Sequence, residues 1–241
     1  MLSSIKHTLK RVQTSKSKLL IQDLKHTWVF LYAFIYIPWF LYLEKMITNT
    51  SNFKIIHCKL DDLIPFCEIF VLPYIIWFAY VAIFIGLFFF VSKEEFYKIT
   101  AYMFIGMTIC LIIYTVYPNG HDLRLNEFPR DNVFTKLVNE FYTADTCTNV
   151  LPSIHSFNSL VIMIAVFKSN ILRKFKYYKA ICITCTTTTI LIMLSTVFIK
   201  QHSVLDMFAA IILSVVMYPF IYVFNYSKIK DNSIDVLEQE I

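Results

Sequence analysis

The sequence is short of glycine and of charged residues. Only three of its 241 residues are glycine, and Asp, Glu, Lys and Arg together make up 16%, whereas hydrophobic residues make up 57%. The mean hydropathy is +0.59. Because soluble domains are typically about one-quarter charged, this composition disfavours a soluble protein and indicates an integral membrane protein.

The apolar residues are gathered in long runs. A helix needs about 20 apolar residues to cross a hydrocarbon core about 30 Å thick. Six runs are candidates, namely 28–43, 70–91, 99–117, 156–167, 180–199 and 204–224, and the fourth is the shortest. The pattern predicts an all-α, polytopic membrane helix bundle with about six transmembrane helices.

Internal repeats and low-complexity linkers are absent, which favours one membrane domain at 28–224. An amphipathic lead at 1–27 precedes it, with Leu2, Ile5 and Leu9 at helical spacing among lysines, and a polar tail at 225–241 follows. The first apolar run has no small-residue cleavage site, so we expect a retained span and no signal peptide.

Lysine and arginine are distributed unevenly between the predicted loops. Fifteen of the 22 lie in 1–27, 92–98, 168–179 and 225–241, which form one set of alternating segments. Because cytoplasmic loops carry the excess of Lys and Arg, both termini are predicted to be cytoplasmic, in what we expect to be the cell membrane. The net charge of +5 then faces anionic lipid and implies no nucleic-acid partner.

Two cysteines, Cys58 and Cys147, fall in the two loops predicted to lie outside. An oxidising compartment would allow them to form a disulfide bond. The second of these loops, 118–150, is the longest polar segment of the domain. Long loops in compact proteins are often functional.

The segment Pro152-Ser153-Ile154-His155-Ser156 stands where this loop meets the fourth apolar run. Proline with serine beside it is a helix-start pattern. A helix N-terminus offers unpaired N–H groups and the positive end of the helix dipole, which favour phosphate binding. His155 would lie beside such a phosphate, although polar residues that merely cap a helix are an equally simple interpretation.

His202 and Asp206 are four residues apart at the start of the last run. This spacing predicts that both side chains lie on one helical face, where a carboxylate can orient the imidazole as a nucleophile or base. Topology places His155, His202 and Arg124 at the same membrane face. Two histidines, an aspartate and an arginine at one membrane face are better explained by a phosphoryl-transfer site than by chance.

These residues resemble two motifs of the type 2 phosphatidic acid phosphatase superfamily. Residues 152–156, PSIHS, resemble its PSGHS box, and residues 195–206, STVFIKQHSVLD, resemble its SRxxxxxHxxxD box. Thr196 replaces the arginine of the second box, and Lys200 and Arg130 are candidates to compensate. In the first box, KxxxxxxRP, Arg124 is kept, but Tyr117 replaces the lysine and Leu125 the proline.

The resemblance implies a role for each matching residue. His202 is expected to be the nucleophile, Asp206 to orient it, and His155 to act as general acid and base. Arg124, Ser153, Ser195 and Lys200 are expected to bind the substrate phosphate. No cofactor or metal is implied. Zinc is the competing use of two His and one Asp, but a close HxxxH or HExxH pair is absent. His121, near Arg124, is a candidate for a minor binding role.

The predicted function is hydrolysis of a lipid phosphate or diphosphate, of the phosphatidic acid or polyprenyl diphosphate type, through a phosphohistidine, with the site facing outside or the lumen. A membrane lipid is the expected substrate. The alternative is a lipid phosphotransferase resembling sphingomyelin and inositol phosphoceramide synthases, which relax the phosphate-binding cations. A transporter or non-enzymatic protein is the third possibility, but paired Gly or Pro breaks in the spans are absent.

Overall fold

The computed structural model describes residues 25–47 and 53–224. The chain divides at Pro38 into two compact units. The described part of the first unit holds the 3-10 helix η1 (Lys25–Tyr32) and the start of α2 (Ala33–Met46). The second unit, from Trp39 onward, holds the rest of α2 and the remaining described elements.

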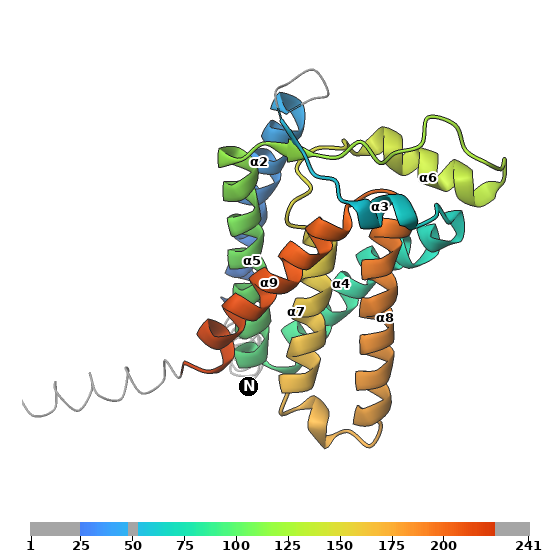
Figure 1. Ribbon diagram of the computed structural model, residues 1–241. Coiled ribbons are helices and arrows are strands. Elements are labelled where there is room, and N and C mark those ends of the chain that lie inside the picture. Colours follow the sequence, from blue (N-terminus) through green and yellow to red (C-terminus); the bar gives the residue numbers. More distant parts are fainter. Residues whose placement is uncertain (1–24, 48–52, 225–241) are drawn as a thin grey trace, which may run out of the picture. The chain divides into compact units, whose positions relative to one another are not determined.

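The second unit is a helix bundle, seen in Figure 1. Its long helices are α4 (Val71–Val91), α5 (Lys93–Val116), α7 (Ile154–Lys168), α8 (Tyr178–Phe198) and α9 (Val204–Tyr222). The connections contain α3 (Lys59–Leu63), η2 (Glu68–Phe70), α6 (Val133–Ala144) and η3 (Leu172–Lys174). In the described ranges, strands are limited to β1 (Lys54–Ile55) and β2 (Asn119–Gly120), which pair in parallel.

Five helical segments are long and apolar enough to cross a membrane, namely Lys25–Met46, Glu68–Val91, Lys93–Val116, Tyr178–Phe198 and Val204–Tyr222. They confirm the all-α polytopic fold. The remaining predicted span, the fourth at 156–167, corresponds to α7, which is apolar but has only 15 residues. At about 1.5 Å per residue it is some 22 Å long, shorter than a hydrocarbon core.

Helix α7 forms the packed centre of the bundle and lies against α4, α5, α8 and α9. Phe157, Val161 and Ile162 are fully buried on it. Gly106 on α5 allows a close approach, because a Cβ atom there would stand 2.0 Å from Cζ of Phe157. This packing holds a short helix, and the polar residues at its start, inside the bundle.

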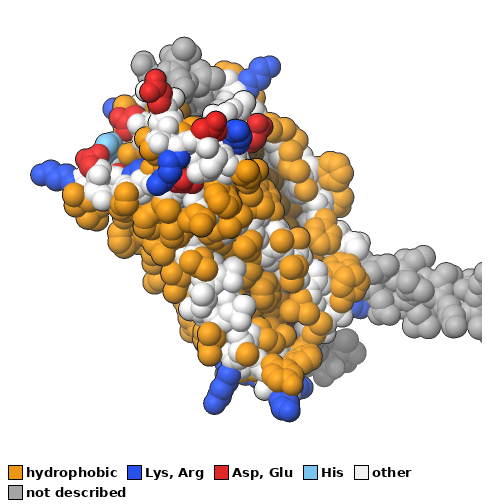
Figure 2. Space-filling model, turned by 90° about the vertical axis from the view of Figure 1, so that its right-hand side faces the viewer, with side chains coloured by type: hydrophobic (Ala, Val, Ile, Leu, Met, Phe, Trp, Pro, Cys, Tyr) orange, Lys and Arg blue, Asp and Glu red, His pale blue; other side chains and the backbone are white. Residues whose placement is uncertain are grey.

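The outer surface of the long helices is apolar. Phe90 is 82% exposed on α4, Ile112 46% on α5 and Ile212 63% on α9. Figure 2 shows apolar side chains over the middle of the face in view, with charged side chains gathered toward its ends. This arrangement is typical of helices that meet lipid hydrocarbon.

Several predictions concern residues at or beyond the edges of this structure. Nearly all of the predicted lead at 1–27, and the tail at 225–241, lie outside the described residues. The domain boundaries and the cytoplasmic placement of the termini therefore stay predictions. Cys58 and Cys147 are not joined in a disulfide bond.

Candidate active site

One end of the bundle collects the predicted site residues. The starts of α7 and α9, the end of α8 and the start of α4 meet there, and we call it the histidine end (Figure 1). His202 Nδ1 lies 3.2 Å from Asp206 Oδ2, and His202 Nε2 lies 3.4 Å from His155 Nδ1. His202 is therefore held between a carboxylate and a second imidazole.

The contact between His202 and Asp206 is made differently from the prediction. Helix α9 begins at Val204 and is capped by Ser203, so His202 precedes the helix and does not share a face with Asp206. Asp206 instead folds back from the first turn, and its Oδ2 accepts from Ser203 N at 2.8 Å as well as facing His202. The helix cap and the histidine thus share one carboxylate oxygen.

His155 is the second residue of α7 and is half-buried. Its ring centroid lies 4.8 Å from that of Tyr74 and 4.4 Å from that of Trp77, both on α4. These aromatic rings fix the imidazole next to His202. Tyr74 and Trp77 could not be identified from the sequence, because nothing in an aromatic-rich apolar run distinguishes rings that face a site.

The two predicted serines have mainly local bonds. Ser153 caps α7, because its Oγ accepts from Ser156 N at 3.3 Å, and its own N–H donates to Asp206 O at 3.1 Å. The helix start predicted here is confirmed, with Pro152 one residue before the cap. Ser195 is fully buried in α8, where its hydroxyl donates to Ile192 O at 2.6 Å. Their phosphate-binding roles stay predictions.

Arg124 lies near His202 but is largely occupied by protein acceptors. Its two terminal nitrogens donate to the carbonyl groups of Tyr142, Asp145 and Thr146, and to Oε1 of Gln201 at 2.6 Å. The guanidinium also lies 4.8 Å from the centroid of the Tyr142 ring. Arg124 therefore joins the end of α6 to the residue before His202, and only its Nε–H remains for another partner.

Three buried nitrogen atoms in the loops near His202 have no hydrogen-bond partner among the described residues: His121 Nε2, Arg124 Nε and Gln201 Nε2. His121 Nδ1 accepts from Leu123 N at 3.2 Å, so the ring proton lies on Nε2. Gln201 turns its oxygen to Arg124, so its other amide atom is the NH2 group. All three are hydrogen-bond donors, and buried donors normally find a partner.

Lys200 and Arg130, the candidates to compensate for Thr196, bind other groups. Lys200 Nζ donates to the carbonyls of Asp61 and Ile64 at 2.7 and 2.6 Å, and its backbone adopts a left-handed φ of 56°. Arg130 pairs with Glu68 at 2.7 Å. Thr196 is itself fully buried and donates to Met193 O. Lys200 thus holds the turn before His202, with one N–H left over.

Asp61 is a buried residue of the site that the sequence analysis missed. It accepts from Ser203 Oγ at 2.6 Å and from Val204 N and Cys58 N, each at 2.8 Å. Burial alone would raise its pKa, but the hydrogen bonds from Ser203 and Val204 hold that pKa below its usual value. Asp61 anchors the segment that carries His202 from 142 residues away in sequence.

Burial controls the charge of the loop histidines. It lowers the pKa of His202 to about 3, assisted by the positive charge of Arg124. It also lowers the pKa of His121 to about 3, assisted by His202 and Arg124. Asp145, whose carbonyl binds Arg124, has its pKa raised to about 6 by burial and by the nearby Glu44. Both histidines are therefore neutral at pH 7, and an imidazole nucleophile must be neutral to react.

The two His and one Asp considered for zinc are in contact with one another. In the part of the chain that the structure describes, no three His, Cys, Asp or Glu side chains are grouped closely enough to hold a metal ion. His202 and Asp206 already share their facing atoms with each other. The two His and one Asp considered for zinc in the sequence analysis thus form a relay of bonded side chains.

Comparison with known protein families supports the motifs. The family described as the PAP2 superfamily matches residues 128–230, which run from before α6 to beyond α9 and include His155, His202 and Asp206. The match confirms the resemblance to the type 2 phosphatidic acid phosphatase superfamily. It begins after Arg124, so it does not cover the first box. No curated protein and no solved structure matches the chain.

Proposed function

We propose that the protein removes phosphate from a lipid phosphate or diphosphate through a phosphohistidine. Residues 128–230 belong to the PAP2 superfamily, whose members are generally phosphatases or phosphotransferases. The observation that carries the proposal is His202 held between Asp206 at 3.2 Å and His155 at 3.4 Å. With Asp206 ionised, the ring proton lies on Nδ1, and the lone pair of Nε2, which faces His155 Nδ1, attacks a phosphate that binds between the two rings.

The first step transfers the phosphoryl group to the protein. His202 Nε2 attacks phosphorus, the bond from phosphorus to the ester or diphosphate oxygen breaks, and protonated His155 gives its proton to the departing oxygen. Asp206 stabilises the positive charge that develops on the His202 ring. In the second step His155 takes a proton from water, the hydroxide attacks phosphorus, and the P–N bond breaks to release inorganic phosphate.

The unpartnered donors near His202 are suited to the phosphate oxygens. His121 Nε2, Arg124 Nε and Gln201 Nε2 are buried, and donors fixed in a water-poor site stabilise developing negative charge. We assign them the part that the missing cations at Tyr117 and Thr196 play in the family motif. The first turn of α7, with the positive end of its helix dipole, adds further N–H groups.

The position of the site fits a substrate that stays in the bilayer. His155 and His202 lie at the end of helices whose outer surfaces are apolar. The tail of a lipid can remain in hydrocarbon while its phosphate reaches the histidines. From the distribution of Lys and Arg, we place this end outside the cell membrane or on the lumenal side.

The test is phosphate release by the purified full chain in detergent, without added metal, from phosphatidic acid and from a polyprenyl diphosphate. The parent protein is expected to release phosphate from at least one of them, and His202→Ala from neither. Asp131→Asn, which alters an exposed residue paired with Lys136, is the matched control and should retain activity. Equal release by the parent and His202→Ala would contradict the proposal.

A phosphotransferase is the second candidate. It is favoured by Thr196, which is buried and bonded within its own helix where the hydrolase motif has an arginine. In that reaction a lipid alcohol replaces water in the second step. Incubation with a phospholipid donor and a short-chain ceramide or diacylglycerol separates the two, because a transferase forms a phosphorylated lipid alcohol without releasing phosphate. A transporter or scaffold is disfavoured by the family match.

A further inference from the structure

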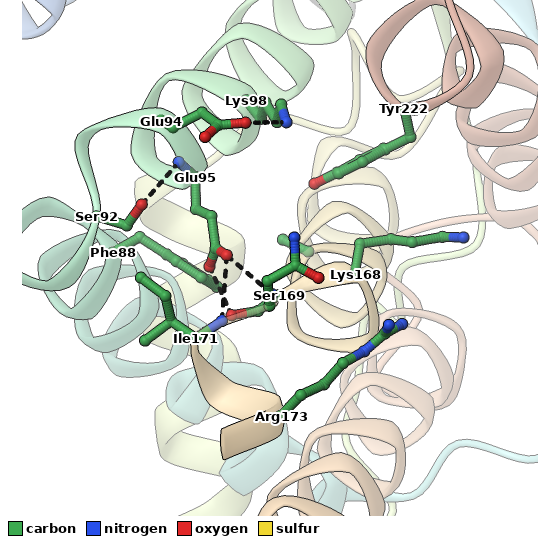
Figure 3. Close-up of a pocket in the computed structure, with 12 residues that line it drawn as sticks. Phe88, Ser92, Glu94, Glu95, Lys98, Lys168, Ser169, Ile171, Arg173 and Tyr222 are labelled. Carbon is green, nitrogen blue, oxygen red and sulfur yellow. Dashed lines mark hydrogen bonds and ion pairs between the residues drawn. The ribbon is translucent and has the colours of Figure 1, made fainter. Parts of the chain in front are cut away.

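The end of the bundle opposite the histidines contains a polar cavity, drawn in Figure 3. It has a volume of about 390 Å³ and lies where α5 begins, α7 ends and η3 and the end of α9 meet. Its lining includes the cations Lys98, Lys168 and Arg173 and the carboxylates Glu94 and Glu95. The cavity is separate from the proposed phosphatase site.

The two carboxylates of this cavity are already occupied by the protein. Glu95 accepts from Ser169 Oγ at 2.5 Å and from Asn170 N and Ile171 N at 2.9 and 3.3 Å. Glu94 pairs with Lys98 at 2.5 Å. Their negative charge is therefore engaged by fixed donors, and they are poorly placed to hold a cationic ligand.

Two of the cations retain free donors. Within the described residues, Lys168 and Arg173 form no ion pair with a carboxylate; Lys168 Nζ lies 5.2 Å from the Tyr218 ring centroid, and Arg173 donates one N–H to Phe167 O. Figure 3 shows both side chains on the side of the cavity away from Glu95. The lining therefore carries three cations against two carboxylates, a net charge of +1, which favours an anion.

An apolar groove adjoins the cavity. It has a volume of about 1140 Å³, lies between α5 and α9, and shares Glu94, Lys98 and Tyr222 with the polar cavity. Beyond these residues its lining is mainly apolar, with Ala101 and Ile105 on α5 facing Leu213 and Phe220 on α9. A polar cavity with cations therefore opens beside a groove that runs along the lipid-facing helices.

We propose that this pair of hollows binds an anionic glycerophospholipid, with its phosphate at Lys168 and Arg173 and its acyl chains in the groove. Charge complementarity favours the headgroup, because Lys and Arg near the membrane surface attract anionic lipids. The groove favours a lipid over free phosphate, because only a lipid brings apolar chains to cover it. The lipid would stabilise the bundle or tune its activity from the leaflet opposite the proposed substrate.

The test is native mass spectrometry of the full chain in detergent, titrated separately with phosphatidylglycerol, phosphatidylcholine and inorganic phosphate. Phosphatidylglycerol is a phosphodiester, so it is not a substrate of the proposed phosphatase, and its binding is measured independently of that activity. We expect one tightly bound phosphatidylglycerol per chain and clearly weaker binding of phosphatidylcholine. Equal binding of the two lipids would overturn the assignment to an anionic headgroup.

Two variant pairs locate the site. K168Q/R173Q should weaken phosphatidylglycerol binding by about tenfold or more, as expected for two membrane-surface cations. K174Q/K176Q removes the same charge from neighbouring residues that do not line the cavity and should have little effect. Equal weakening by both pairs would mean diffuse attraction to a basic surface and would overturn the proposal.

A third pair tests the groove. A101W fills it from α5, whereas A82W places the same side chain on the exposed surface of α4. We expect only A101W to weaken phosphatidylglycerol binding. If A101W has no effect and inorganic phosphate displaces the lipid, the cavity is a free-phosphate site and the lipid proposal is wrong. Thermal unfolding of each variant checks that the fold is kept.

Discussion

The two ends of the bundle each use a carboxylate to hold a loop, but the loops carry different groups. At the histidine end, Asp61 accepts from Ser203 Oγ and two backbone N–H groups, and it fixes the segment that carries His202. At the opposite end, Glu95 accepts from Ser169 Oγ and two backbone N–H groups, and it fixes the turn that leads to Arg173. One anchoring device therefore serves two sites of different chemistry.

The two ends of the bundle differ in whether their charged side chains are already bonded to the protein. At the histidine end, His202 is buried and neutral, and the guanidinium of Arg124 is bonded to carbonyl groups. These side chains are therefore held in place before a substrate binds. At the opposite end, Lys168 and Arg173 keep their charge at the edge of a cavity. Preorganised neutral groups suit chemistry, whereas open cations suit the binding of an anion.

The largest expected effect comes from changing Asp206, the carboxylate that orients His202 at the histidine end. Asp206→Asn keeps the shape of the side chain but removes the charge that holds His202 Nδ1–H. We expect kcat/KM to fall about 10³- to 10⁴-fold, as for loss of an orienting carboxylate elsewhere. Steady-state phosphate release measures this. Activity within tenfold of the parent would show that Asp206 only caps α9.

The next prediction tests the donors around the phosphate. Gln201→Glu keeps an oxygen for Arg124 but replaces the unpartnered NH2 group by a second carboxylate oxygen, which repels phosphate. We expect kcat/KM to fall about 10²-fold, comparable with loss of one oxyanion donor. Glu140→Gln, a charge change of the opposite sign at an exposed position of α6, is the control for long-range charge. Unchanged kinetics in Gln201→Glu would remove Gln201 from the site.

A third prediction compares the two anchors directly. Asp61→Asn and Glu95→Gln each weaken charge-assisted hydrogen bonds worth about 1.5–3 kcal/mol, so both should lower the melting temperature. Only Asp61→Asn disturbs the segment before α9, and we expect it to lower kcat about tenfold more than Glu95→Gln does, with little change in KM. A drop in kcat that only tracks the loss of stability in both variants would show that Asp61 has no positioning role.

The smallest prediction uses pH. Burial lowers the pKa of His121 to about 3, below its unfolded value of about 6.5, so the unfolded chain binds more protons between these values. The contribution of His121 to stability is therefore present above pH 6.5 and is lost as the pH falls toward 3. His121→Gln should lessen the fall in melting temperature between pH 7 and 5, because it removes a loss of unfolding free energy of up to about 1.4 kcal/mol per pH unit. Identical pH profiles would contradict a buried neutral His121.

The sequence could predict the parts of the site that are encoded locally. The apolar runs gave helices of spanning length, and the spacing of His202 and Asp206 identified two side chains that do contact each other. It placed them wrongly on one helical face, because the helix start at Val204 depends on capping by Ser203 and Asp206. Contacts between residues that are close in the sequence can be predicted from their spacing.

The rest of the site depends on contacts between distant residues. Asp61 meets Ser203 across 142 residues, and Arg124 meets Gln201 across 77. No local spacing reports such pairs. The resemblance to the family boxes predicts that Arg124 and Lys200 bind phosphate, whereas the structure shows most of their N–H groups on backbone carbonyls. Only the folded chain shows that these carbonyl groups compete with phosphate for the N–H groups of Arg124 and Lys200.

The most direct test of the account is to trap the phosphohistidine. Purified His155→Ala is mixed with an activated aryl phosphate, whose leaving group needs no proton, so the first step proceeds while the second lacks its base. Peptide mass spectrometry should then find an acid-labile phosphate on His202, and none in the His155→Ala/His202→Ala double variant. A trapped phosphate on another residue, or turnover of the activated substrate that persists in His202→Ala, would contradict the central claim that His202 is the nucleophile.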